Sequence, residues 1–448
     1  MSNSPPTDIV PPEVQFIQVI HIDINGISRG KVFPIGKLSD LLRKKEEIIC
    51  IIGMIGTNSE IISSIKEISH YENARLVLDK STIRVAPWSQ DCSLAMVFAD
   101  VYDRVGNSPL PINPRLLAKC KINELEAMDL KLVIGIENEF RIFNKTDKKF
   151  VQNSMKHYSQ FHQITESYSY IKELNKDLKK CDILIDSWNF ECGSGQIEIP
   201  LLSSEGIEGL DKTWMFKEIS KYVADKMGLV ASYMTVPIPA ESGNGCHINH
   251  SLWTKSEKGP TNAMWEPEKV DELSEIGKYW LAGILKHSRG LSAIYSPTVN
   301  CYRRIQSALF APDKISWNYR DRSVAMRVKT SQDYEKMNYI ENRIPSSACN
   351  IYLAVAGMIV AGIDGIKNKL QLPEHGNGSH CERLPTTLSE ALSALKDDKV
   401  LVEGLGAKFV DWYVKVKEET DVKVLKDSDL HNNTEEGISQ EFIKYFDI

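Results

Sequence analysis

Acidic side chains recur in this sequence at spacings that would bring them together. Glu137 and Glu139 lie two residues apart in KLVIGIENEFRIF, a segment rich in β-branched and aromatic residues, so a strand would project both carboxylates from one face. Glu191 and Glu198 flank a Gly-Ser-Gly turn in WNFECGSGQIEIP, and such a turn can fold two short strands so that both acids reach one point. Paired acids on a strand are most often solubilising groups, so neither pair alone identifies a site.

One histidine and a fifth glutamate extend this set. His247 follows several small or turn-forming residues in SGNGCHINHSLW, and Glu341 lies two residues before Arg343 in IENRI. A single histidine is more often a structural residue than a ligand. The six side chains together, however, suit hard divalent cations such as Mg²⁺ or Mn²⁺, and six ligands are too many for one magnesium ion that keeps its waters. The set therefore predicts two or more metal ions.

Arginines concentrate between residues 300 and 343. Guanidinium forks grip phosphate and carboxylate oxygens in pairs, although a run of charge usually means a solvated surface. Combined with divalent cations, the arginines indicate phosphoryl transfer from a nucleotide, in which guanidinium groups take the charge on the transferred group. The residues concerned are Arg303, Arg304, Arg320, Arg322, Arg327 and Arg343, with Lys336 beside them.

The composition limits the class of protein. The 448 residues are 42% hydrophobic and 25% charged, a globular balance with room for two domains. The net charge of −6 disfavours nucleic acid as a partner, and 9 cysteines without a CxxC pair fit reduced thiols in a cytoplasmic protein. The N-terminus lacks the features of a secretory signal, and the most apolar segment, 352–363, is too short for a bilayer span and predicts a buried helix, so no membrane partner is expected.

The first hundred residues predict a small α+β unit. Residues 1–12 are rich in proline and serine and are expected to be disordered. Strands at 14–24 and 28–34 flank Asn25-Gly26, which is a hairpin signal. The other elements expected in this unit, which would span 13–107, are a helix at 35–45 and strands at 48–54, 74–85 and 95–101.

The remaining chain, 112–448, predicts a larger domain. It begins with Asn113-Pro114, a helix N-cap followed by proline at the first helical position. Residues 144–180 are polar and lysine-rich and are interpreted as a surface excursion. The other expected elements are strands at 131–143 and 230–238 and helices at 210–227, 270–289, 348–366, 387–397 and 403–417.

Eight motifs in order resemble the glutamine synthetase family from about residue 14 to the C-terminus. They are DINGISRGKV, GIENEF, ECGSGQIEI, GNGCHINHSL, NCYRRI, RDRSVAMRV, IENR and ACNIYLAVAGMIVAGIDGI. The resemblance implies an α+β fold with a small β-grasp N-terminal domain and a large catalytic domain whose curved antiparallel sheet is flanked by helices. It also implies a homo-oligomer, usually two stacked hexameric rings (a dodecamer), with active sites shared between neighbouring subunits.

The resemblance assigns the ligand residues to two metals. The metal on the glutamate side would be held by Glu139, Glu191 and Glu198. The metal on the nucleotide side would be held by Glu137, His247 and Glu341. Both would be Mg²⁺ or Mn²⁺, with ATP as co-substrate.

The resemblance also implies substrate contacts. Arg304 and Arg343 match glutamate-binding positions, with Gly243 in the loop that holds the amino group. Arg322 and Arg327 match a phosphate-facing pair, and Arg322 also lies on the glutamate side. The expected catalytic residues are Arg322, Arg327 and Glu341, and the expected nucleotide-binding residues are Ser251, Arg327 and Lys336.

Several positions depart from the family pattern. The ammonia-binding loop of the family carries an aspartate where residues 53–58, GMIGTN, have none. The other departures are Asn73 for a second acid of that pocket, Phe310 for the glutamate of the closing flap, Ser242 for the asparagine of the glutamate loop, and Tyr339 for an arginine that touches nucleotide. Asn73 and Phe310 thereby become candidates for an amine pocket. The pattern looks closer to γ-glutamylamine (polyamine) ligases and lengsin-like proteins than to ammonia-using synthetases.

The expected function is therefore an ATP-dependent ligase that joins glutamate to an amine, or to ammonia, through a γ-glutamyl phosphate intermediate. An alternative from another class is a non-catalytic, lengsin-like structural ring protein on the same fold, because a fold alone does not grant activity.

Overall fold

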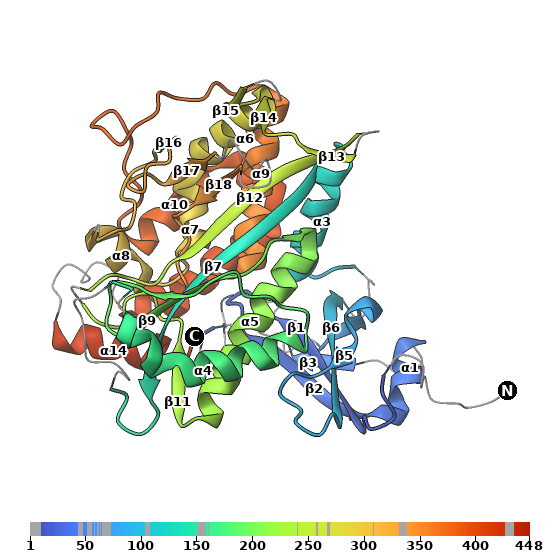
Figure 1. Cartoon of the computed structure of the whole chain (residues 1–448). Helices are drawn as coiled ribbons and strands as arrows, with labels where there is room; N and C mark the ends of the chain where they lie inside the picture. The colour runs from blue at the N-terminus through green and yellow to red at the C-terminus, as the bar shows by residue number, and fades with distance from the viewer. Residues whose placement is uncertain are drawn as a thin grey trace.

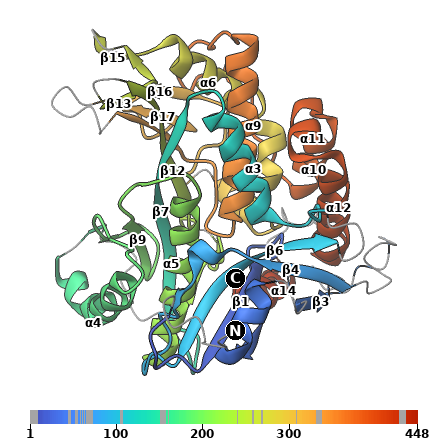
Figure 2. The same cartoon turned by 90° about the vertical axis from the view of Figure 1, so that its right-hand side faces the viewer.

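The protein is described from a computed structural model in which a small N-terminal sheet packs against a larger body of sheet and helices (Figures 1 and 2). The residues that the structure describes are 10–43, 48–51, 56–57, 59–60, 62, 64, 73–103, 108–149, 158–159, 161–239, 241–256, 259–266, 269–307, 309–330, 338–425 and 434–448. The domain limits predicted at 13, 107 and 112 stay predictions, since residues 1–9 and 104–107 lie outside these ranges.

The N-terminal sheet has the strand order β2-β1-β6-β4-β3, with β5 paired to β6. β1 and β6 run parallel, and the other neighbours are antiparallel. The predicted Asn25-Gly26 hairpin is confirmed: Gly26 has φ +83°, and Asp23 Oδ1 accepts hydrogen bonds from the backbone N–H groups of Asn25 and Ile27. The elements are β1 Phe16–Ile22, β2 Ser28–Pro34, η1 Ile35–Lys37, α1 Leu38–Leu42, β3 Ile48–Ile51, β4 Asn73–Leu78, η2 Lys80–Thr82, β5 Arg84–Val85 and β6 Leu94–Asp103.

Within the described residues the large sheet has ten strands, and it is built around β7, a strand of 14 residues. Its main path runs β16-β17-β18-β12-β7-β9-β8, and β7 and β12 cross the molecule side by side (Figure 1). All neighbours are antiparallel except β16 and β17. The strands are β7 Lys131–Asn144, β8 Asn189–Phe190, β9 Gln196–Pro200, β10 Ser204–Glu205, β11 Leu229–Ser232, β12 Cys246–Ser256, β13 Gly259–Asn262, β16 Trp317–Tyr319, β17 Met326–Lys329 and β18 Tyr339–Asn342; β14 Trp265–Glu266 and β15 Lys269–Leu273 form a separate hairpin.

Helices gather to one side of this sheet, where α3, α6 and α9 stand together (Figure 2). The central helix, α9, begins after Asn350, whose side chain accepts hydrogen bonds from the N–H groups of Tyr352 and Leu353. It is long and apolar enough to cross a membrane by length and composition, yet 83% of that window is buried inside the protein, which confirms the predicted buried helix. The helices are α3 Pro114–Glu126, α4 Phe161–Lys179, α5 Gly206–Lys226, α6 Glu275–Lys286, α7 Ser288–Tyr295, α8 Cys301–Ser307, α9 Ile351–Asn368, α10 Leu388–Asp397, α11 Lys399–Leu405, α12 Ala407–Lys417, η4 Glu418–Val422, α13 Lys423–Leu425 and α14 Glu435–Tyr445.

Several sequence interpretations were wrong, among them the two that follow. The supposed surface excursion at 144–180 contains α4, whose buried Tyr170, Leu174 and Leu178 form an apolar stripe at helical spacing among the lysines. The helix predicted at 270–289 starts later, because Ser274 caps α6 by accepting a hydrogen bond from Gly277 N–H at 3.1 Å and the preceding residues form β15.

A buried arginine joins the two sheets of the protein. Arg115, on α3, donates to both carboxylate oxygens of Asp211 on α5, at 2.9 and 2.8 Å, and to Asp79 beyond β4 at 3.0 Å. Asp211 also accepts from the Tyr352 hydroxyl of α9 at 2.8 Å. Because a buried charge is tolerated only when it is paired, this network fixes how the N-terminal sheet sits on the larger body.

A second buried ionic contact holds three helical segments together. The imidazole of His287, between α6 and α7, contacts Asp398 Oδ2 through Nδ1 at 2.6 Å and Asp364 Oδ2 through Nε2 at 3.0 Å. Lys286 also reaches Asp364, at 3.0 Å. Burial alone would lower the pKa of His287, but the hydrogen bonds to the two carboxylates outweigh it and raise that pKa.

We therefore predict a pH-dependent stability contribution from His287. A folded-state pKa above the unfolded value of about 6.5 means that the contribution is complete below that value and disappears as pH rises through the folded pKa. His287→Gln should lower the free energy of unfolding by about 1–3 kcal/mol at acidic pH and by less at alkaline pH, measured by urea titration across the range. His380→Gln, at an exposed position, is the control; an equal loss for His287→Gln at every pH would contradict the prediction.

Candidate functional site

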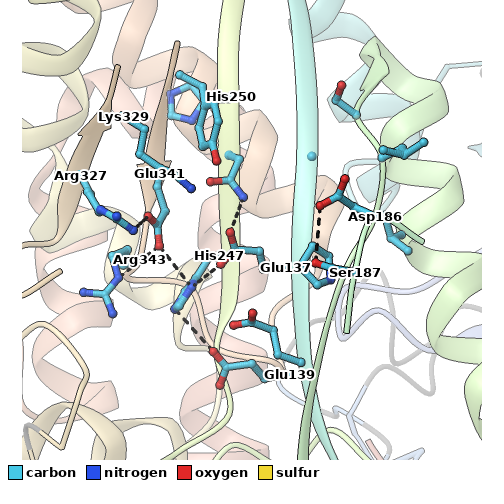
Figure 3. A pocket seen from close by; sticks show the side chains of 18 of the residues that line it. Glu137, Glu139, Asp186, Ser187, His247, His250, Arg327, Lys329, Glu341 and Arg343 are labelled. Atoms are coloured by element: carbon cyan, nitrogen blue, oxygen red, sulfur yellow. Dashed lines mark hydrogen bonds and ion pairs between the residues drawn. The ribbon is translucent and has the colours of Figure 1, made fainter. Parts of the chain in front are cut away.

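The large sheet brings the predicted acids and histidine to one face. In the β7–β12 register Glu137 lies opposite His247, and in the β7–β9 register Glu139 lies opposite Glu198. β18 places Glu341 opposite Asn249 of β12. The labelled side chains of these strands converge on His247 in Figure 3.

One ligand group is formed by Glu137, His247 and Glu341, whose candidate ligand atoms all lie within 4.8 Å of one another. His247 Nδ1 is 3.0 Å from Glu137 Oε2 and 3.5 Å from Glu341 Oε1. Asn249 Nδ2 donates to the other Glu137 oxygen at 2.9 Å, which fixes the orientation of that carboxylate. This is the trio that the sequence assigned to the nucleotide side.

The second group consists of Glu139, Glu198 and His247. Glu139 Oε2 accepts hydrogen bonds from Gln196 Nε2 and Gly245 N–H, both at 2.8 Å. Glu191, the third acid predicted here, lines the same cavity and accepts from Asn189 Nδ2 at 3.2 Å. His247 thus lies within reach of both groups, whereas the sequence assigned it to one.

The electrostatics of the acids show how strongly their charges interact. Burial, together with the negative charge of Glu139, raises the pKa of Glu191 to about 7 and that of Glu198 to about 8. Burial opposes the charged form of His247, but its hydrogen bond with Glu137 and the charges of Glu139 and Glu137 raise its pKa to about 9. Carboxylates this crowded favour a bound cation that offsets their repulsion.

The donor set fits hard divalent cations. The two groups offer carboxylate oxygens and one imidazole, which are ligands for Mg²⁺ or Mn²⁺, and none of their members is a thiol. Second contacts from Asn249, Gln196 and Gly245 orient the carboxylates, as is usual around bound metals. The side chains present are therefore compatible with two cations.

Three arginines border the acids. Arg304, on α8, is buried and donates to the carbonyl groups of Ile344 and Arg343 at 3.1 and 3.2 Å. Arg343 and Arg327 each contact Glu341, at 3.3 and 3.0 Å. Arg343 Nη1 and Arg327 Nε are buried without a hydrogen-bond partner among the described residues, and buried donors in that state are costly unless a ligand satisfies them.

Glycine is required where the loop before β12 passes the arginine. A Cβ on Gly243 would lie 2.9 Å from Arg304 Cγ, and one on Gly245 would lie 2.9 Å from His247 Nε2. Both distances are shorter than real side chains allow, so the GNG motif permits the loop to approach the site closely.

A cavity of about 1420 Å³ contains the whole arrangement. Arg322 and Phe310 are exposed residues of its lining, and Ser251 lies deeper, accepting a hydrogen bond from Trp253 Nε1 at 2.9 Å. Asn73 belongs to β4 of the N-terminal sheet, and its side chain is outside the described part of the chain. Lys336 also falls outside the described residues, so its assignment stays a prediction.

The sequence analysis did not identify Arg141, whose contacts hold two loops together beside the acids. Arg141 is fully buried; its guanidinium donates to Glu241 Oε2 at 2.6 Å and to the Ser242 carbonyl at 2.5 Å. Glu241 in turn accepts from Ser194 N–H at 2.9 Å, which ties the loop before His247 to the turn between Glu191 and Glu198. The available signal was the charge at Arg141, two residues after Glu139 and so on the same face of β7.

Known proteins match this chain over most of its length. The family model described as "Glutamine synthetase, catalytic domain" matches residues 111–433. The chain is 31% identical to a glutamine synthetase of Pyrococcus furiosus over 97% of both chains, and 30% identical to one of Methanosarcina mazei over 91% of both.

Solved structures share the fold. A complex described as GmaS with ADP superimposes with a TM-score of 0.80 at 24% identity over 96% of both chains. A structure described as a novel glutamine synthase homolog has a TM-score of 0.81 at 22% identity, covering 97% of this chain and 99% of that one. The family model and the curated relatives indicate a protein of a ligase family. The chain belongs to the glutamine synthetase family.

We predict that Glu198→Gln weakens binding of Mn²⁺ at this face by about tenfold or more, because it removes one negative charge and keeps the shape of the side chain. Titration calorimetry with Mn²⁺ on the folded variant measures the change. Glu208→Gln, at an exposed position of α5, is the matched control and should bind as the wild type does. Equal Mn²⁺ affinity in both variants would remove Glu198 from the ligand set.

Proposed function

We propose that the protein is an ATP-dependent ligase that joins the γ-carboxylate of glutamate to an amine, or to ammonia, through γ-glutamyl phosphate. The observation that carries this proposal is the meeting of two acid–histidine groups with Arg304, Arg327 and Arg343 in one cavity. Family membership supports glutamate, ATP and divalent metal as the reactants and cofactors of that cavity.

The residues divide the chemistry between them. In the first step a γ-carboxylate oxygen attacks the terminal phosphorus of ATP, and ADP leaves with the electrons of the broken bond. Divalent cations bound by the two groups would supply charge neutralisation at the phosphates. Arg304 and Arg343 hold the glutamate, while Arg322 and Arg327 face the transferred phosphoryl group and balance its charge, with Glu341 orienting Arg327.

In the second step a neutral nitrogen attacks the acyl carbon and phosphate leaves. The nitrogen must first lose a proton, because a protonated amine is no nucleophile. The acids that relatives would use fall at Asn73, Phe310 and the loop 53–58, where this chain has none. We propose that Phe310 and Asn73 belong to an amine pocket and that a primary organic amine is preferred over ammonium.

The geometry of Phe310 supports an apolar acceptor site. Its side chain is 71% exposed at the cavity, beside Leu309, and its aromatic face can hold an organic ammonium by a cation–π contact of about a kcal/mol. Two acids that could replace the missing ones are already paired within the chain, Glu60 with Lys444 and Asp313 with Arg383. A third, Glu72, lies outside the described residues.

A structural ring protein without activity is the second candidate. It is favoured by Ser242 and Tyr339, which replace an asparagine and an arginine expected of catalytic members. The intact set of acidic ligands favours the enzyme. For either candidate we propose a cytoplasmic homo-oligomer, with two hexameric rings as the expected form.

The amine preference is tested by ADP release with glutamate and a panel of acceptors at equal free-base concentration. Methylamine, ethanolamine or putrescine should give a higher kcat/KM than ammonium. Phe310→Glu should shift the ratio towards ammonium because it restores an acid, while Phe310→Leu should not. Ammonium winning by tenfold in the wild type would refute the amine preference, and no turnover with any acceptor would favour the structural protein.

Assembly gives an independent prediction. If each site is shared between subunits, light scattering should detect a ring of about ten or more chains, and activity should fall on dilution to monomers. A fully active monomer at working concentration is the result that would overturn shared sites.

A further inference from the structure

The cations that line the cavity differ in whether their charge is already balanced. Lys131 pairs with Glu205 at 2.8 Å, and Arg327 and Arg343 contact Glu341. Arg304 is held by backbone carbonyl groups. Besides Arg304, two lining cations have no carboxylate partner among the described residues: Arg322, which is exposed, and Lys329, which is half-buried.

Lys329 is held by a neutral side chain. In the β17–β18 register it lies opposite Tyr339, and its ammonium is 4.6 Å from the centroid of the Tyr339 ring. A tyrosine side chain is an uncharged phenol at neutral pH. The tyrosine therefore positions the ammonium without neutralising it.

The lysine also shares a face with the proposed phosphate-contacting residues. Lys329 is two residues from Arg327 on β17, as Tyr339 is two residues from Glu341 on β18, so all four side chains leave the sheet on one side. Figure 3 shows Lys329 and Arg327 projecting into the same space above Glu137 and His247. This is the side of the cavity where the Glu137–His247–Glu341 group lies.

We propose that Lys329 binds a phosphate group of the nucleotide, with Tyr339 as the residue that positions its ammonium. The inference rests on the proposed function in that the ligand of this cavity is a nucleotide. An ammonium on a flexible stem is a common point-charge partner for phosphate. The family resemblance implies a nucleotide-contacting arginine at the position of Tyr339 on β18. In this protein Lys329, opposite Tyr339 on β17, would supply that positive charge instead.

A simpler role for Lys329 would be to offset the negative charge of Glu137. The two roles predict different effects of losing the lysine on nucleotide binding. If Lys329 only offsets Glu137, its removal strengthens Mn²⁺ binding and leaves nucleotide affinity unchanged. If it binds phosphate, its removal weakens binding of ADP and spares adenosine, which has no phosphate.

The experiment compares Kd values of the full-length protein for Mg²⁺–ADP, adenosine and Mn²⁺ alone by titration calorimetry. Lys329→Met should weaken Mg²⁺–ADP by about tenfold, leave adenosine within about twofold, and leave Mn²⁺ binding equal or tighter. Lys329→Arg should retain most of the affinity. Adding Tyr339→Arg to Lys329→Met should restore it, because a cation then returns from β18. Lys278→Met, on the surface of α6, is the control.

The measured affinities test the Lys329–phosphate contact and the proposed ligase activity separately. Unchanged Mg²⁺–ADP affinity in Lys329→Met, or an equal loss for adenosine, would overturn the phosphate contact. A wild type that binds Mg²⁺–ADP but ligates no amine would refute the proposed activity and leave the Lys329 contact standing. A wild type that does not bind Mg²⁺–ADP would overturn both.

Discussion

Repulsion among buried carboxylates is the constraint around which this protein is arranged. Glu137, Glu139 and Glu198 lie on adjacent strands around His247, and crowding with burial raises the pKa of Glu198 to about 8. Groups that repel one another stay together only when a rigid framework holds them. β7 provides it, since β12 and β9 bond to its two edges and leave its acids no freedom to separate.

Helices packed against the large sheet support that framework, and they also hold the N-terminal sheet in place. The helices α3, α6 and α9 stand together on one side of the sheet, so apolar packing anchors the strands whose other face carries charge (Figure 2). The hairpin of the N-terminal sheet is held by α5 and by the N-terminus of α9: Trp214 of α5 donates to the Gly26 carbonyl at 3.2 Å, and the side chain of Asn350, the residue before α9, donates to the Asp23 carbonyl at 2.9 Å.

Local patterns predicted the parts of the site that depend on local structure. The alternation of residues along β7 predicted that Glu137 and Glu139 share a face, and the Gly-Ser-Gly turn predicted that Glu198 lies near Glu191. Both predictions were possible because strand alternation and turn formation depend only on residues that are close in the sequence. The contacts of Arg141 with Glu241 and Ser242, and of Lys329 with Tyr339, could not be predicted, because each depends on a partner that tertiary folding or strand register brings close. The position of His247 within reach of both groups could not be predicted for the same reason, since the members of the two groups come from four strands, β7, β9, β12 and β18.

One arginine contacts both an acidic ligand residue and the backbone of Phe310. Arg343 contacts Glu341 through Nε at 3.3 Å and donates from Nη2 to the Phe310 carbonyl at 3.2 Å. Phe310 has φ +61°, a conformation that a bulky residue adopts only when its surroundings impose it. Because the same guanidinium holds both ends, any ligand that draws Arg343 away from Glu341 also alters the support of Phe310. The acidic group and the backbone of the proposed acceptor residue therefore share one contact, the guanidinium of Arg343.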